Sequence, residues 1–149
     1  MSVNKLSKHT SRLAAVQVMY QLDMTEGDLE KVISDFLIHY VNKEEEYHDI
    51  NLSFFKKLTN HFVGREELNE LINKNLQASK VLNLPSSITR SILKVAIIEM
   101  LHENTDIPII INEFVNISKY FVDNKNVKFI NAILDAISKQ VERQCKVKA

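Results

Sequence analysis

The sequence predicts an all-α fold of about seven helices, and three observations support this prediction. Apolar residues recur at helical spacing through almost the whole chain. Only two glycines and two prolines occur in 149 residues, which leaves few of the sharp turns that strand-rich folds need. The composition, 45% hydrophobic and 26% charged, is that of an ordinary globular protein with enough chain to bury its own core.

Four helices are expected before residue 85, each from a run of apolar residues at helical spacing. The runs lie within residues 5–24, 29–41, 54–62 and 68–76. Asp28 precedes the second run and is expected to cap it, while Gly64 follows the third and is expected to end it. The acidic run Glu44–Glu46 has nothing to bury, so we expect it to be a solvated loop.

Three further helices are expected after Pro85, where Ser86 can cap the first of them. Residues 88–101 are apolar on most sides, so this helix is predicted to be the most buried. The turn at residues 106–108 and the polar residues 123–124 separate the next two helices. Their apolar stripes are Ile110, Phe114, Ile117 and Phe121, followed by Val127, Ile130, Leu134, Ile137 and Val141.

The chain contains no linker long enough to separate domains, so residues 1–149 are expected to form one domain with a subdomain break near 80–86. No 18-residue apolar run occurs, and no apolar core follows Lys5 and Lys8, which argues against a membrane span or a signal peptide. The single cysteine, Cys145, suits a reducing compartment, and a cytoplasmic location is expected.

Enzymatic chemistry has little support in the sequence, so no catalytic residue, metal or cofactor is expected. Glycines at 27 and 64 cannot build a nucleotide-binding loop. The five histidines include no i, i+3 or i+4 pair that could begin a metal site. Glu99 lies inside the most apolar helix, where a structural carboxylate is favoured over a catalytic one.

The first candidate binding group is the basic start of the first helix, where Lys8, His9 and Arg12 occur without a nearby acid. Tyr20 follows two turns later and could offer an aromatic ring. Cations and a stacking surface are what single-stranded RNA requires. The alternative is a solvated chain end, with Tyr20 in the core.

The second candidate group opens the last helix and contains Lys125, Asn126, Lys128 and Phe129. Lysines are disfavoured at a helix N-terminus by the macrodipole, so their position indicates that an anion lies nearby. The alternative is a row of exposed lysines beside a packed Phe129.

Four segments of the chain together resemble the NusB family of bacterial transcription antitermination factors. They are Arg12 to Tyr20, Ser91 to Met100 before the Asp106–Pro108 turn, Ile111 to Glu113 before Ser118 and Lys119, and Lys128 to Asp135. Their order and spacing extend the resemblance over nearly the whole chain. The chain departs from the family in lacking the usual arginine run near His9, and it has Ala132 in place of a glycine.

The resemblance implies two packed three-helix bundles without catalysis or cofactor. It implies an RNA-binding adaptor that pairs with NusE, a small-subunit ribosomal protein, binds boxA of nascent ribosomal RNA and helps RNA polymerase read through terminators. Carried over by position, the RNA-binding residues are Lys8, His9, Arg12, Tyr20, Lys125, Asn126, Lys128 and Phe129. The resemblance places the NusE-binding surface largely on the second half, at Thr89 and Arg90.

Two alternatives to this function stay open. The first is a helical protein-interaction module that does not bind RNA directly. The second is the helical appendage of ribosomal RNA methyltransferases, which is similar to NusB but would precede a catalytic domain with a glycine-rich cofactor turn. These 149 residues contain no such turn.

Overall fold

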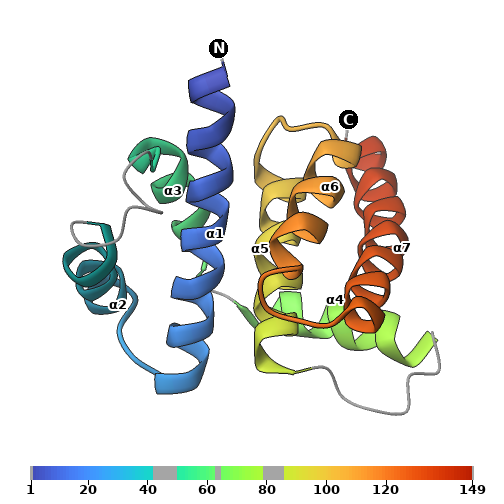
Figure 1. Ribbon diagram of the computed structural model, residues 1–149. Helices are drawn as coiled ribbons and strands as arrows, with labels where there is room; N and C mark the ends of the chain where they lie inside the picture. The colour runs from blue at the N-terminus through green and yellow to red at the C-terminus, as the bar shows by residue number, and fades with distance from the viewer. Residues whose placement is uncertain (1, 42–49, 63–64, 79–85, 149) are drawn as a thin grey trace. The chain divides into compact units, whose positions relative to one another are not determined.

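The computed structural model describes residues 2–41, 50–62, 65–78 and 86–148, and their side chains over 8–39, 50–62, 66–78 and 86–142. Its elements are α1 (Ser2–Thr25), α2 (Leu29–Phe36), the π-helix η1 (Leu37–Val41), α3 (Leu52–Thr59), α4 (Arg65–Ala78), α5 (Ser87–His102), α6 (Ile107–Ser118) and α7 (Asn124–Lys148). The described residues are almost entirely helical, so the predicted all-α class is confirmed (Figure 1).

The chain divides into two compact units, Met1–Val63 and Gly64–Ala149. The sequence predicts a subdomain break near 80–86, on the other side of α4. In the structure α4 packs on α5 and α7 and therefore belongs to the second unit. That residues 1–149 form a single domain stays a prediction.

The first unit is a three-helix bundle in which α2 and α3 both pack on α1 (Figure 1). Five apolar positions within residues 14–19 show how α1 supplies the centre of this bundle. Ala14, Ala15, Val16, Val18 and Met19 are all completely buried. The Phe36 and Phe55 rings stack at a centroid distance of 6.2 Å, which joins α2 to α3.

The second unit is a three-helix bundle of α5, α6 and α7, with α4 added on α5 and α7. Each of α5, α6 and α7 packs on the other two, and successive helices run in opposite directions (Figure 1). Every residue from Ser91 to Met100 is buried, which confirms α5 as the most buried helix. The predicted α7 stripe is confirmed, because all five of its residues are buried.

Three predicted helix starts are confirmed, two of them with a side-chain capping hydrogen bond. The Asp28 carboxylate accepts a hydrogen bond from the backbone N–H of Lys31 at the start of α2. Ser86 Oγ accepts one from the Thr89 N–H at the start of α5. Asp106 precedes α6, with Pro108 in its first turn, where the missing proline N–H costs no hydrogen bond.

Two helix ends differ from prediction. The apolar run at 29–41 continues past Phe36 as a π-helix, a change of winding that periodicity over five residues does not reveal. The regular part of α3 ends at Thr59, but i to i−3 backbone hydrogen bonds from His61 and Phe62 continue the turn. The Phe62 side chain is therefore still fully buried. Glu44–Glu46, Gly64 and Pro85 lie outside the described residues.

Candidate nucleic-acid interface

Two of the predicted RNA-binding cations meet one aromatic ring in the first unit. Lys8 and Arg12 are four residues apart on α1 and therefore share a face of the helix. Lys8 Nζ lies 5.3 Å and Arg12 Cζ 5.2 Å from the centroid of the Phe54 ring on α3. Both distances allow cation–π attraction, which links the start of α1 to α3.

Lys8 and Arg12 differ sharply in exposure. Lys8 is exposed, whereas only 3% of Arg12 is accessible to solvent. An exposed ammonium can meet a phosphate without rearrangement of the helix. The buried Arg12 guanidinium instead contributes packing to the first unit, in addition to its predicted part in RNA binding.

A second contact holds α1 against the start of α3. Ser11 Oγ donates a hydrogen bond to the Asn51 carbonyl and accepts one from the Asn51 N–H, both at 2.9 Å. The Asn51 side chain in turn caps α3 by accepting a hydrogen bond from the Phe54 N–H at 3.1 Å. These hydrogen bonds therefore hold the start of α1 in place against the start of α3.

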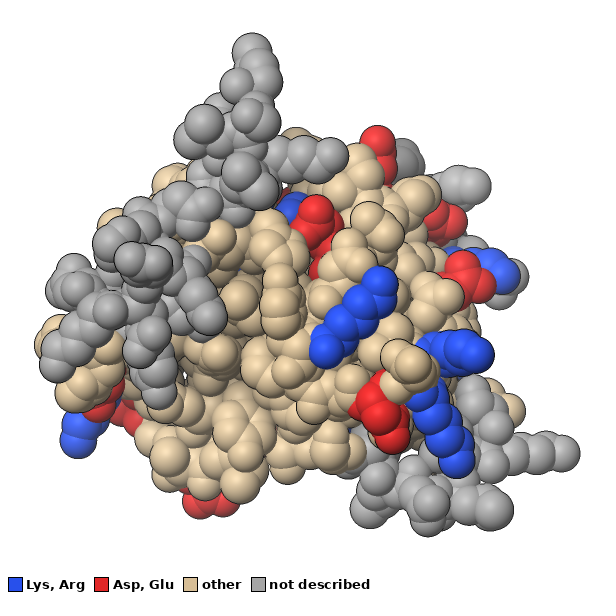
Figure 2. Space-filling model, in the orientation of Figure 1, with Lys and Arg blue, Asp and Glu red and all other residues tan. Residues whose placement is uncertain are grey.

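The second predicted group lies at the turn between α6 and α7. Lys125 and Lys128 are exposed and three residues apart in the first turns of α7, so they share one face. Neither forms a side-chain hydrogen bond or an ion pair with another described residue. Figure 2 shows lysine and arginine side chains interspersed with carboxylates over the side where α6 and α7 lie in Figure 1, a face of mixed charge.

Asp123 caps α7 and provides an anion beside these lysines. Its Oδ1 accepts hydrogen bonds from the Asn126 N–H at 3.0 Å and from Asn126 Nδ2 at 2.8 Å. These bonds, with a smaller effect from the positive charge of Lys125, hold the pKa of Asp123 below its ordinary value. Asn126, predicted to bind RNA, thus also has a capping role. The anion inferred from the lysines' position is in part the chain's own Asp123.

The remaining predicted RNA-binding residues are less accessible. Tyr20 and Phe129 are half-buried, as is His9. The groups that the structure brings together are Lys8 with Arg12, and Lys125 with Asn126 and Lys128. The first group lies in unit 1 and the second in unit 2.

One exposed aromatic residue was missed by the sequence analysis. Tyr120 follows α6 and is 67% exposed, more than any other exposed large apolar side chain in the described part of the chain. The signal was available, because Tyr120 falls outside the stripe ending in Ile117 and Phe121 and directly follows Lys119.

The predicted NusE-binding residues have structural contacts of their own. Thr89 is 1% exposed, and its hydroxyl lies 2.9 Å from Ser86 Oγ in the α5 cap. Arg90 is half-buried and its Nη2 donates a hydrogen bond to Asn73 Oδ1 on α4 at 2.9 Å. Arg90 is therefore the more accessible of the two.

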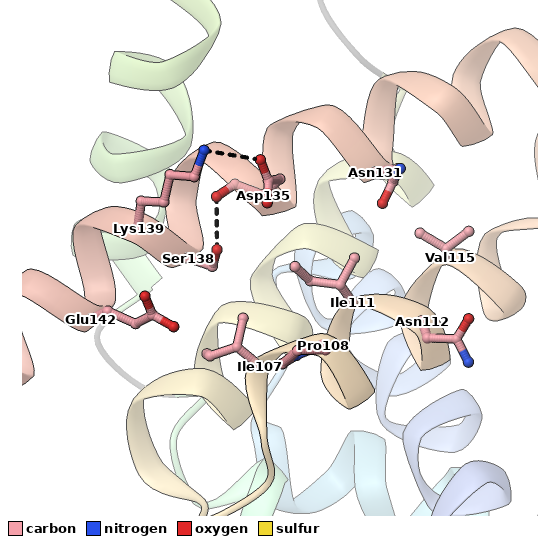
Figure 3. Close-up of a pocket in the computed structure, with 10 residues that line it drawn as sticks. All are labelled: Ile107, Pro108, Ile111, Asn112, Val115, Asn131, Asp135, Ser138, Lys139 and Glu142. Atoms are coloured by element: carbon pink, nitrogen blue, oxygen red, sulfur yellow. Dashed lines mark hydrogen bonds and ion pairs between the residues drawn. The ribbon is translucent and has the colours of Figure 1, made fainter.

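The groove between α6 and α7, about 550 Å³, lacks the arrangement of a catalytic site (Figure 3). Ser138 Oγ donates to the Asp135 carbonyl at 2.7 Å, and Lys139 pairs with the Asp135 carboxylate at 3.4 Å. No histidine lines this groove to activate the serine. Glu99, on α5, is completely buried, and every buried polar side-chain atom of the described residues has a hydrogen-bond partner.

Metal binding and membrane insertion find no support in the described residues. Among them, no three His, Cys, Asp or Glu side chains come together as a metal ion would require. None of the described helices has the length and apolar character of a membrane span.

Comparison with known proteins places this geometry in a family. The family model described as the NusB family matches residues 9–139. The chain belongs to the NusB family. The transcription antitermination protein NusB of Sinorhizobium fredii is 33% identical over 137 residues, covering 88% of this chain and 85% of that protein. The protein of the same name from Bartonella tribocorum is 30% identical over 146 residues, covering 94% and 92%.

Two solved structures show that the fold is also that of NusB. T. maritima NusB has a TM-score of 0.67 at 23% identity, covering 89% of this chain and 90% of that one. A structure of the antitermination factors NusB and NusE in complex with dsRNA has a TM-score of 0.69 at 22% identity, covering 94% and 98%. Because the curated relatives are transcription antitermination proteins, the expectation that this chain is not an enzyme is confirmed.

Proposed function

We propose that this protein is a cytoplasmic transcription antitermination factor that, together with NusE, binds the boxA element of nascent ribosomal RNA and promotes readthrough by RNA polymerase. Membership of the NusB family and the antitermination function of its curated relatives support this role. The observation that carries direct RNA binding is the pair Lys125 and Lys128, two exposed cations on one face at the start of α7.

Lys125 and Lys128 can bind phosphate because of where they stand on α7. The positive end of the helix dipole adds to their charge, since backbone N–H groups point toward an anion there. Phe129 follows Lys125 by four residues and so shares its face. The negative charge of Asp123 cancels part of the positive potential that the two lysines and the helix dipole create. The attraction of this turn for RNA is therefore moderate.

At the start of α1, Lys8 supplies the exposed charge and His9 is half-buried beside it. Arg12 holds this turn against Phe54 and adds positive potential from beneath the surface. We assign direct neutralisation of a phosphate to Lys8. Arg12 contributes to it through the positive potential of its buried charge. Tyr20, being half-buried, offers part of its ring.

NusE pairing is proposed for the second unit near Arg90, which reaches from α5 to Asn73 on α4. Thr89 supports this surface from the core through the α5 cap. The structure solved with both NusB and NusE shares this fold, which is the ground for the partner.

The test of direct RNA binding is the double variant Lys125→Ala with Lys128→Ala, assayed by filter binding to boxA-like single-stranded RNA. Loss of two phosphate contacts should reduce the magnitude of the salt slope by about 1.4 and weaken binding roughly tenfold near physiological salt. Lys139→Ala is the matched control, because this lysine lies on the same helix but is already paired with Asp135. The control should bind like the unmodified protein.

A parallel assay with scrambled RNA, with and without NusE, separates the alternatives. Retention of boxA-like RNA by the chain alone supports an RNA-binding adaptor. Retention only when NusE is present, with the double variant unchanged, would show a protein-interaction module that reaches RNA through its partner.

A further inference from the structure

The side chain of Tyr120, just after α6, is the most exposed large apolar side chain among the described residues. Aromatic side chains stabilise a fold when they are buried, and a ring left 67% exposed forgoes most of that stabilisation. The neighbouring Phe121 is half-buried, so the core at this end of α6 is already supplied with an aromatic residue. Tyr120 therefore presents aromatic surface to solvent.

The backbone holds Tyr120 in a defined position. The Tyr120 N–H donates to the Ile117 carbonyl at 3.0 Å, and the Val122 N–H donates to the Ser118 carbonyl at 2.9 Å. The Tyr120 ring meets the Phe121 ring edge-on, with centroids 6.5 Å apart and an interplanar angle of 70°. A ring placed by its own turn loses little conformational freedom when a ligand stacks on it.

In the sequence Tyr120 has lysines on both sides, with one carboxylate, Asp123, between it and Lys125. Lys119 precedes it and is exposed, and Lys125 and Lys128 begin the helix that follows a short turn. An exposed aromatic ring among lysines is the combination that binds single-stranded nucleic acid, because the ring stacks on a base while the cations neutralise the backbone. A basic or purely apolar protein partner would not match these charges.

We propose that Tyr120 is a base-stacking residue for single-stranded RNA at the α6–α7 turn. This inference rests on the proposed function and adds a contact to it. It gives the stacking role to the most exposed ring in place of the half-buried Tyr20 and Phe129.

The first experiment compares Tyr120→Ala and Tyr120→Phe in filter binding to boxA-like RNA. Removal of one stacking ring should weaken binding about 5- to 150-fold. The slope of affinity against salt should not change, because no charge is removed. Tyr120→Phe keeps the ring and should bind within about twofold of the unmodified protein. Circular dichroism should show the same helicity for all three proteins, since the side chain is exposed.

The second experiment uses the absence of tryptophan from the sequence. In Tyr120→Trp the new indole is the only one in the protein, and stacking on a base should quench its fluorescence when boxA-like RNA is added. Ile109→Trp is the matched control, because Ile109 is 46% exposed near the other end of α6. Its fluorescence should not change with RNA.

Three outcomes would overturn the inference. Equal RNA affinity of Tyr120→Ala and the unmodified protein, while the Lys125 and Lys128 double variant is weakened, removes the stacking role and leaves the proposed function intact. Equal fluorescence quenching of the Ile109→Trp and Tyr120→Trp variants by RNA would also remove the stacking role and leave the proposed function intact. Failure of the unmodified protein to bind the RNA removes both.

Discussion

The start of α1 and the start of α7 have similar residues but use them differently. At α1, Lys8 and Arg12 face the Phe54 ring, and Arg12 is almost completely buried. At α7, Lys125 and Lys128 extend into solvent beside the Asp123 cap. Arg12 is therefore part of the packing of its unit, whereas Lys125 and Lys128 can be removed without opening the core.

A group of basic residues can therefore stabilise the fold, bind a ligand or do both. A buried guanidinium over a ring is stabilised by packing and cation–π attraction, so its loss is felt in folding. An exposed lysine contributes little to stability, and its charge is available to a polyanion. Variants in the two regions should therefore separate stability from binding.

The largest effect is expected for Arg12→Ala, which removes a buried side chain from the contact between α1 and α3. The free energy of unfolding should fall by about 2 kcal/mol or more, because packing, cation–π attraction and hydrogen-bond partners are lost together. Urea denaturation followed by circular dichroism measures this change.

Lys8→Ala is the control for Arg12→Ala, because it faces the same ring from an exposed position. Its cost should stay below about 1 kcal/mol. If the two variants were equally stable, the distinction between a packed and a solvated cation on α1 would be lost.

An intermediate effect is expected for Ser11→Ala, which leaves the Asn51 N–H and carbonyl without their side-chain partner. Ser11 is completely buried and both hydrogen bonds are 2.9 Å long, so the expected loss is about 1 to 2 kcal/mol. Ser53→Ala, an exposed change on α3, should stay within about 0.5 kcal/mol. Equal unfolding curves for both serine variants would contradict a role of Ser11 in fixing α1.

The smallest effect concerns Asp123 and depends on pH. Its pKa is lowered in the folded protein, so its contribution to stability is complete above the ordinary value of 3.8 and is lost as pH falls through the lowered folded value. Asp123→Asn keeps a capping oxygen but has no charge. The difference in Tm between the variant and the unmodified protein should therefore be larger near pH 6.5 than near pH 2.5.

Asp106→Asn is the comparison for this pH dependence. Asp106 also precedes a helix, but its side chain makes no capping hydrogen bond. Its substitution removes the same charge from a helix start without removing a side-chain capping hydrogen bond. The same pH profile for both variants would show that the Asn126 hydrogen bonds do not set the behaviour of Asp123.

Most of the fold could be predicted from the sequence because local signals and burial agree. Ser86 and Asp28 cap the helices that follow them, and the Val127 to Val141 stripe is buried as its spacing requires. The winding of η1 could not be predicted, since five residues do not distinguish a π-helix from an α-helix. The placement of α4 in the second unit depends on tertiary contacts that periodicity does not encode.

The candidate site was predicted less completely, for a physical reason. Sequence gives the charge of Arg12 and Lys125 alike, but only packing decides that one is buried over Phe54 and the other exposed. The capping role of Asn126 depends on Asp123 three residues earlier, a pairing that the sequence analysis did not use. Tyr120 lies outside the apolar stripe that contains Ile117 and Phe121, but its degree of exposure depends on the packing at the end of α6.

The amide pair between α4 and α7 has a consequence for dissecting this protein into fragments. Gln140 Nε2 donates to Asn75 Oδ1 at 2.9 Å, and Asn75 Nδ2 also donates to the Leu71 carbonyl at 2.8 Å. A truncated chain starting at Ser86 would lose α4. The Gln140 amide would then lack its hydrogen-bond partner, on an apolar surface that α4 no longer covers. A fragment of the second unit that keeps this contact must therefore include α4.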